Sequence, residues 1–188
     1  MRWLLPIFLV AVLPLQAGEL TLADLDGGKQ QPLLLGDKRV RVLLFVTHDC
    51  PISNAYCPEY RRLRMEYAAK KVEFTLIYVD PDAKKEELLK HRREFGLNQF
   101  KAIHDVRHAL VKATGAEMTP EAVVIGKEGK IKYRGRVDNL YADYGKRRRT
   151  GATVRDLRNA LDALLSGNPV PKPRTEAIGC FIPPLPTQ

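Results

Sequence analysis

An apolar run followed by a cysteine and then by an amphipathic stretch constrains the fold of this chain more than any other feature. Residues 40–46 (Val-Arg-Val-Leu-Leu-Phe-Val) are typical of a buried strand. Residues 54–71 place four apolar side chains at three- and four-residue steps, the period of one helix face: Tyr56, Tyr60, Leu63 and Tyr67. The pattern therefore predicts a strand–helix unit with Cys50 at the junction.

The position of Cys50 favours chemistry at its sulfur. The first turn of a helix has free backbone N–H groups and the positive end of the helix dipole, and both stabilise a thiolate, the nucleophilic form of cysteine. Pro51 suits the first position of that helix. The alternative interpretation is a small buried cysteine that only packs. The junction favours redox or nucleophilic chemistry over simple packing.

The N-terminal segment is typical of a secretory signal. Arg2 precedes an apolar stretch over residues 3–15, and Leu15-Gln16-Ala17 is a suitable cleavage end. The stretch is short for a membrane span and contains prolines. We therefore predict a signal peptide over residues 1–17 and a periplasmic or secreted protein. Contact with a membrane is expected only if this segment is not cleaved.

Removal of that segment leaves about 170 residues, enough for one domain with its own core. We expect this domain over residues 18–166 and a Pro-rich tail over residues 167–188. The net charge is +9, but the basic residues are scattered, and the densest cluster, residues 146–149, is expected to form a solvated loop. The sequence therefore does not favour a nucleic-acid partner.

The remaining patterns predict an α/β fold with a mixed central sheet, helices on both faces, an N-terminal β extension and the C-terminal Pro-rich tail. The tail is unusual because Cys180 lies between apolar residues, which a solvated tail would leave in water. We expect it to pack on the domain with its apolar side chains, Ile178, Phe181 and Ile182. The other expected strands are a hairpin turning at residues 26–29, a strand at 72–79 and two strands around a turn at 127–130. The other expected helices cover residues 83–95, 106–114 and 153–165, with Thr153 as the N-cap of the last.

Three features resemble the thioredoxin-like superfamily, specifically its exported bacterial redoxin or peroxiredoxin-like branch. Cys50 follows the first core strand, Pro58 lies eight residues later, and Thr119-Pro120 precedes a two-stranded hairpin. The resemblance covers residues 19–166. It implies that Pro58 kinks the helix and that Pro120 is cis and faces the reactive sulfur. The Thr119 backbone would then lie where a substrate strand could pair with it.

The chain also departs from the patterns of that superfamily. Ser53 stands in place of the second cysteine of the usual pair and is expected to hydrogen-bond the Cys50 thiolate. His48 stands where a tryptophan is usual. Thr47 matches the threonine that precedes the peroxidatic cysteine of peroxiredoxins, whereas Leu43 replaces the proline of that motif.

The distance over which each of the other two cysteines can approach Cys50 indicates its disulfide partner. Cys57 shares the helix face of Cys50 but lies roughly 10 Å along the axis, beyond the 7 Å or so that a disulfide allows between Cα atoms. It could pair only if the helix unwinds near Pro58. Cys180 lies on a tail long enough to cross the domain. We expect Cys50 to pair with Cys180, either as a catalytic bond resolved by Cys180 or as a structural staple.

The remaining candidates carry weaker signals. His48 is either a proton relay beside Cys50 or a solvent-facing residue, and Asp49 is expected to point outward. His104 and His108 are expected four residues apart on one helix, with a surface or capping role more typical than metal binding. His91 is expected to be solvated in a charged helix. No cofactor and no bound metal are predicted.

Three functions remain open at the level of the sequence. The first is an exported thiol–disulfide oxidoreductase that acts on protein thiols or disulfides with an unknown reductant. Its site residues would be Cys50, Cys180, Thr47, Pro120 and Ser53. The second is a thiol peroxidase whose substrate is a peroxide, in which Thr47 positions the peroxide. The third is non-enzymatic, either a stapled binding module or a copper carrier that uses Cys50, Cys57 and a histidine.

Overall fold

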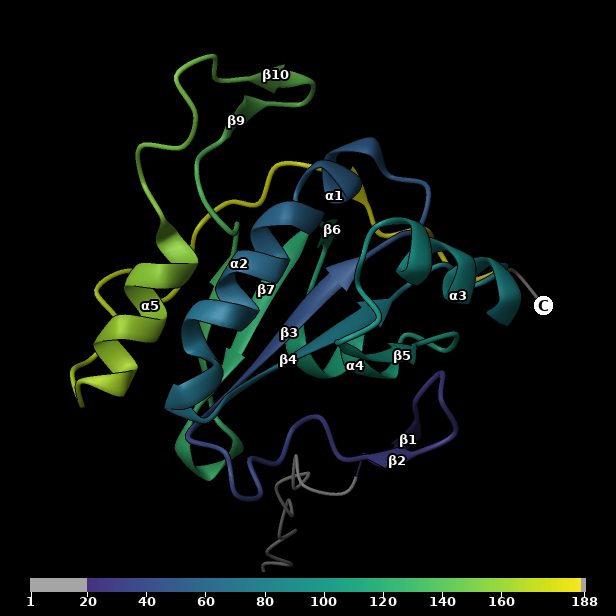
Figure 1. The fold of residues 1–188 in the computed structure, drawn as a ribbon, viewed down its shortest axis with the longest axis horizontal. Helices are drawn as coiled ribbons and strands as arrows, with labels where there is room; N and C mark the ends of the chain where they lie inside the picture. Colours follow the sequence, from purple (N-terminus) through teal and green to yellow (C-terminus); the bar gives the residue numbers. More distant parts are fainter. Residues whose placement is uncertain (1–19, 187–188) are drawn as a thin grey trace, which may run out of the picture.

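The protein is built around a five-stranded mixed sheet, seen in a computed structural model that describes residues 20–186 (Figure 1). The central strand β3 pairs in parallel with β4 and antiparallel with β7. The strand order is β5-β4-β3-β7-β8, and the strands are β3 (Val40–Val46), β4 (Val72–Tyr78), β5 (Lys101–His104), β7 (Glu121–Ile125) and β8 (Ile131–Gly135). The predicted fold class is confirmed.

Helices cover both faces of the sheet and enclose two apolar layers. Side chains of α2 and α5 pack on one face, and α4 packs on the other, where Leu110 belongs to the same apolar cluster as Phe45 and Ile77. The helices are α1 (Pro51–Ala55), α2 (Cys57–Tyr67), α3 (Lys85–Glu94), α4 (Ala109–Thr114) and α5 (Asp156–Leu165), with short 3-10 turns η1 (Ala68–Lys70) and η2 (Lys127–Gly129).

The predicted helix after Cys50 is divided into α1 and α2 at Tyr56. Pro58 lies in the first turn of α2 and has no backbone N–H, so the hydrogen bond that would continue α1 into α2 at that position cannot form. The four side chains of the predicted stripe are all buried, which confirms the predicted core face of the helix.

Among residues 20–186, three two-stranded sheets extend the fold. The predicted N-terminal hairpin is present as β1 (Leu22–Ala23) and β2 (Lys29–Gln30). A second sheet joins β9 (Tyr141–Asp143) to β10 (Lys146–Arg147), so the start of the basic cluster forms a strand where a loop was predicted. The third joins β6 (Met118–Thr119) to β11 (Cys180–Phe181), two segments far apart in the sequence.

Several local predictions were wrong. Residues 101–104 form a short edge strand, so His104 lies on β5 while His108 precedes α4, and the two do not share a helix. The last helix begins at Asp156, because the Thr153 hydroxyl, which was predicted to cap it, instead accepts a hydrogen bond from Nδ2 of Asn139 at 2.9 Å.

The C-terminal tail packs on the domain, as predicted. Arg134 of β8 donates its N–H to Pro173 O at 2.9 Å and accepts one from Thr175 N at 3.1 Å, and the chain then continues into β11. Ile178 and Ile182 pack against the core, but Phe181 is 82% exposed, contrary to prediction. Successive side chains of a strand point to opposite sides, so Phe181 faces away from Cys180. The predicted signal peptide lies outside the described residues.

A buried polar chain links α3 to α1. Tyr78 donates its hydroxyl hydrogen to Nδ1 of His91 at 2.8 Å, and His91 donates from Nε2 to Oδ1 of Asn54 at 2.8 Å. Asn54 in turn donates from Nδ2 to the carbonyl of His48 at 3.0 Å. His91 is therefore buried, where a solvated residue was predicted, because its partners come from distant segments. Within residues 20–186, no helix is long and apolar enough to cross a bilayer.

The tail disulfide is expected to contribute strongly to stability. Its cysteines are 130 residues apart. Closing so long a loop lowers the conformational entropy of the unfolded chain, which raises the free energy of unfolding by roughly 5 kcal/mol. In urea denaturation, Cys180→Ser should lower the free energy of unfolding by an amount approaching that value, and the wild type in reducing agent should match the variant. Equal stability of the oxidised wild type and the variant would contradict this expectation.

His91 should make the fold acid-sensitive. Burial lowers the pKa of His91 to about 4, so below its ordinary value near 6.5 the unfolded chain takes up a proton that the folded chain excludes. Between pH 7 and pH 4, the unfolding free energy of the wild type should therefore fall by about 3 kcal/mol more than that of His91→Gln. Urea denaturation at both pH values measures this difference. Parallel pH profiles would show that His91 does not contribute.

Candidate active site

Cys50 and Cys180 form a disulfide at the N-terminus of α1. Their Cα atoms are 6.4 Å apart. Cys50 is the N-cap of α1 and is 2% exposed, and its Sγ accepts the backbone N–H of Ser53 at 3.4 Å. The structure therefore brings together the two predicted cysteines, with the Cys50 sulfur at the positive end of the helix.

Thr119 and Pro120 lie against this sulfur. The Thr119–Pro120 peptide bond is cis, as predicted, and the Thr119 carbonyl oxygen is 3.4 Å from Cys50 Sγ. The Thr119 hydroxyl contacts the Thr47 hydroxyl and the Cys180 carbonyl, each at 3.4 Å. The four predicted residues Cys50, Cys180, Thr47 and Pro120 thus gather around Thr119, which connects them.

Ser53 is also at the site, but its contact differs from the prediction. The backbone N–H of Ser53, and not its hydroxyl, reaches Cys50 Sγ. Its backbone carbonyl accepts the Cys57 thiol at 3.8 Å. A peptide N–H at the start of a helix is available whatever the side chain, so the residue type at this position does not determine the contact.

Cys57 is a free, buried cysteine and is not paired with Cys50. Burial raises the pKa of its thiol to about 12. At neutral pH the thiol is protonated and shielded from solvent, so it is a poor nucleophile. Cys50 and Cys180 therefore form the disulfide, and Cys57 stays a free thiol in the core.

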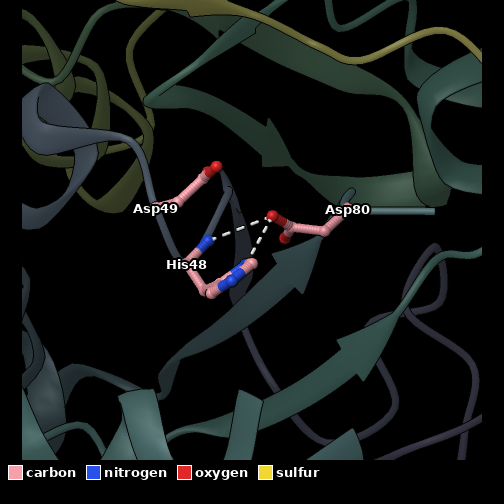
Figure 2. A group of neighbouring side chains, drawn as sticks. All are labelled: His48, Asp49 and Asp80. Atoms are coloured by element: carbon pink, nitrogen blue, oxygen red, sulfur yellow. Dashed lines mark hydrogen bonds and ion pairs between the residues drawn. The ribbon is translucent and has the colours of Figure 1, made fainter. Parts of the chain in front are cut away.

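His48, two residues before Cys50, is hydrogen-bonded to Asp80 (Figure 2). The Nδ1 atom of His48 is 2.8 Å from Oδ1 of Asp80, and the His48 backbone N–H reaches the same oxygen at 3.3 Å. Burial raises the pKa of Asp80, and the pair with His48 partly offsets that shift. The His48 side chain remains about one third exposed, so it connects the buried carboxylate to solvent.

Asp49 completes a group of donor atoms with this pair. One ligand atom from each of His48, Asp49 and Asp80 lies within 4.8 Å of the others. Asp49 is exposed, as predicted. Nitrogen and carboxylate donors suit a divalent cation, but His48 Nδ1 already hydrogen-bonds to Asp80. The arrangement therefore fits a hydrogen bond from Asp80 that orients His48.

An open cavity of about 940 Å³ adjoins the disulfide on the Cys180 side. Its lining includes Glu117, Met118 and, from the β9–β10 turn, Tyr144. Cys180 lines this cavity, whereas buried Cys50 does not. Cys180 is therefore the more accessible residue of the disulfide.

Sequence reasoning missed Asp80, Asn54 and His91. A usable signal existed for Asp80: β3 and β4 are parallel with Val46 opposite Tyr78, so the residues two positions later, His48 and Asp80, meet at the sheet edge. Asn54 and His91 had no such signal, because their bond joins two helices whose relative placement the sequence pattern does not define.

A protein-family model described as Redoxin matches residues 13–147, well over half of the chain. The match includes Cys50 and Pro120, whereas the tail with Cys180 lies beyond it. No curated protein matches the sequence.

Solved structures share the fold. An uncharacterised protein from Geobacillus kaustophilus is 29% identical over 92% of each chain, with a TM-score of 0.77. A hypothetical protein from Sinorhizobium meliloti is 24% identical over 89% of this chain and 91% of its own, with a TM-score of 0.74. A secreted disulfide oxidoreductase from Mycobacterium tuberculosis is 18% identical over 80% of this chain and 97% of its own, with a TM-score of 0.55. The family match and the shared architecture show that the chain belongs to the Redoxin family, with a thioredoxin-like fold.

Proposed function

We propose that this protein is an exported thiol–disulfide oxidoreductase that cycles between the Cys50–Cys180 disulfide and the dithiol. One observation carries the proposal: the disulfide joins a helix N-terminus, at Cys50, to a tail strand that pairs with Thr119. A staple could join any two adjacent surfaces, whereas this bond lies where a thiolate is stabilised.

The half of the cycle that reduces the substrate begins with the Cys50 thiolate. It attacks one sulfur of a protein disulfide, forms a mixed disulfide at Cys50 and releases the other substrate sulfur as a thiolate, which takes up a proton. The Cys180 thiolate then attacks the Cys50 sulfur, forms the internal disulfide and releases the second substrate thiol. The substrate gains two electrons and two protons, and the enzyme loses them.

The dithiol is regenerated through the accessible sulfur. A thiolate of the reductant attacks Cys180 and displaces Cys50 as a thiolate, which the Ser53 N–H stabilises. A second thiol of the reductant then attacks the mixed disulfide, leaving Cys180 reduced and the reductant oxidised. The burial of Cys50 and the position of Cys180 beside the cavity support this order of attack.

The other site residues do not exchange sulfur; they hold the groups around the disulfide in place. Pro120 orients the Thr119 carbonyl toward Cys50, and Thr47 contacts the Thr119 hydroxyl. We also assign His48, which Asp80 holds two residues before Cys50, a role in proton exchange with solvent. We assign these residues positioning roles and assign sulfur exchange to Cys50 and Cys180.

Export rests on two supports. The first is the signal-like character of residues 1–17. The second is the disulfide, because such bonds persist in the periplasm or outside the cell and are rare in a reducing cytosol. The partners would then be exported proteins that carry thiols or disulfides.

The redox potential tests this function. A catalytic Cys50–Cys180 pair should reduce well above about −300 mV, the range of labile disulfides. The chain without residues 1–17 should be equilibrated with glutathione or dithiothreitol buffers and the dithiol fraction measured. Cys57→Ala should leave the potential unchanged, because its buried thiol takes no part. Either Cys50→Ser or Cys180→Ser should abolish turnover of a protein disulfide.

The same preparation separates the rival functions. A potential below that range, with no exchange activity, would identify a structural staple. Rapid oxidation of the dithiol by hydrogen peroxide would favour a peroxidase. Copper uptake by the reduced protein that is lost in Cys57→Ala would favour a metal carrier.

A further inference from the structure

A second cavity lies at the end of the sheet opposite the disulfide. Its volume is about 690 Å³, and small-molecule sites in proteins occupy roughly 300–1,000 Å³. Its lining includes Val40, the first residue of β3, whereas Cys50 follows the far end of that strand. A strand of this length spans roughly 20 Å, and Figure 1 shows β3 running away from this end toward α1. The cavity is therefore separate from the candidate active site.

Three parts of the chain that are distant in sequence form its walls. They are the segment leading into β3, the turn between β7 and β8, and the end of α5 with the start of the tail. Arg39 donates from Nη2 to the Leu165 carbonyl at 2.8 Å, which connects the first wall to the third. The bonds of Arg134 to Pro173 and Thr175 attach the tail to β8. The folded domain thus holds the cavity in place.

The charge of the lining is of one sign. In the described part of the chain, the cavity is lined by four cationic side chains and no carboxylate; the cations are Lys38, Arg39, Lys127 and Lys132. Lys38 pairs with Asp37 at 2.9 Å. The other three form no ion pair within residues 20–186, and the nearby Glu128 is 2.6 Å from Lys130. A cavity that gathers cations in this way favours an anion.

Lys132 is held at the cavity by packing of its stem. A Cβ atom at Gly126 would lie 2.6 Å from Cγ of Lys132, so the absence of a side chain there leaves room for that stem. Gly126 is buried and Lys132 is half-buried, and both line the cavity. A lysine whose methylene groups pack on the protein keeps its ammonium group at the surface, where an anion can reach it.

The rest of the lining is largely apolar. Ile131 is 42% exposed although it lies in β8. Leu164 and Val170 pack against the main core and also line the cavity. Apolar surface left in water is unfavourable, at roughly 25 cal/mol per Å², and a ligand with an alkyl chain would cover it. The same cavity therefore offers cations to one end of a ligand and apolar contacts to the other.

We propose that this cavity binds an amphipathic anion, a carboxylate or phosphate group carried on an alkyl chain. Arg39, Lys127 and Lys132 pair with the acidic group, and the apolar side chains contact the alkyl chain. A small polar anion would leave the apolar surface in water, and a cationic amphiphile would be repelled. No step of the proposed thiol–disulfide cycle uses this cavity, so the inference adds a binding function to the domain.

The test is isothermal titration calorimetry of the full chain at low ionic strength. The probes are decanoate and decyl phosphate, each below the concentration at which it forms micelles. Acetate carries the acidic group without the chain, and decyltrimethylammonium carries the chain with the opposite charge. One variant combines Lys127→Gln with Lys132→Gln. A control variant combines Arg147→Gln with Arg149→Gln, which removes the same net charge from the exposed basic cluster outside the cavity.

Both decyl anions should bind saturably at one site, and the tighter of the two identifies the preferred acidic group. The double lysine variant should bind them about tenfold more weakly, the equivalent of two exposed ion pairs, whereas the control variant should bind them like the wild type. Each methylene added to the carboxylate should tighten binding by up to about fourfold. Ile131→Asn, a change at an exposed side chain, should weaken binding of decanoate but not change the stability of the fold.

Absence of saturable binding for both decyl anions would overturn the proposal. Equal affinities of the double lysine variant and the control variant would overturn the role of this cavity, since any attraction would then come from the net charge alone. Binding of decyltrimethylammonium as tight as that of decanoate would overturn the requirement for an anion, and binding of acetate as tight as that of decanoate would overturn the apolar contact. None of these results depends on the redox behaviour of Cys50 and Cys180.

Discussion

The parallel pairing of β3 with β4 is the interaction on which the candidate active site depends. With Val46 opposite Tyr78, both strands end at one edge of the sheet, so His48 meets Asp80 and the chain turns into α1 at Cys50. The antiparallel neighbour β7 begins at the same edge and places Thr119 and Pro120 against the cysteine. Three strands thus bring sulfur, carboxylate and peptide carbonyl together without any long loop.

This edge is energetically unfavourable in isolation. The Asp80 side chain is almost fully buried, and its Oδ2 has no hydrogen-bond partner among the described residues. Burying a carboxylate in this way opposes its ionisation, and the pair with His48 recovers part of the loss. The chain from Tyr78 through His91 and Asn54 holds the carbonyl of the same His48. The polar network therefore maintains the loop that carries Cys50 in a position that apolar packing alone would not select.

Periodicity and turn chemistry predicted the parts of the molecule that local sequence determines. The strand at 40–46 and the buried stripe from Tyr56 to Tyr67 follow from such patterns, and the tail contact through Cys180 follows from its apolar neighbours and the length of the tail. The short strand β5 was missed because four residues give too little alternation, and its end residues, Lys101 and His104, are polar. The environment of His91 depends on two helices meeting. Phe181 was expected to be buried because its apolar character was read without the alternation of a strand.

The 130-residue separation of the two cysteines also determines what their disulfide encloses. Among the described residues, the five helices and the sheet strands β4, β5, β7 and β8 all lie between Cys50 and Cys180, and β3 ends at Val46, just before Cys50. The disulfide therefore closes a covalent loop around almost the whole domain, and its far end lies on β11, which pairs with β6 inside that loop. Reduction opens this loop beside Cys50, so one chemical event removes a constraint that spans nearly every element of the fold.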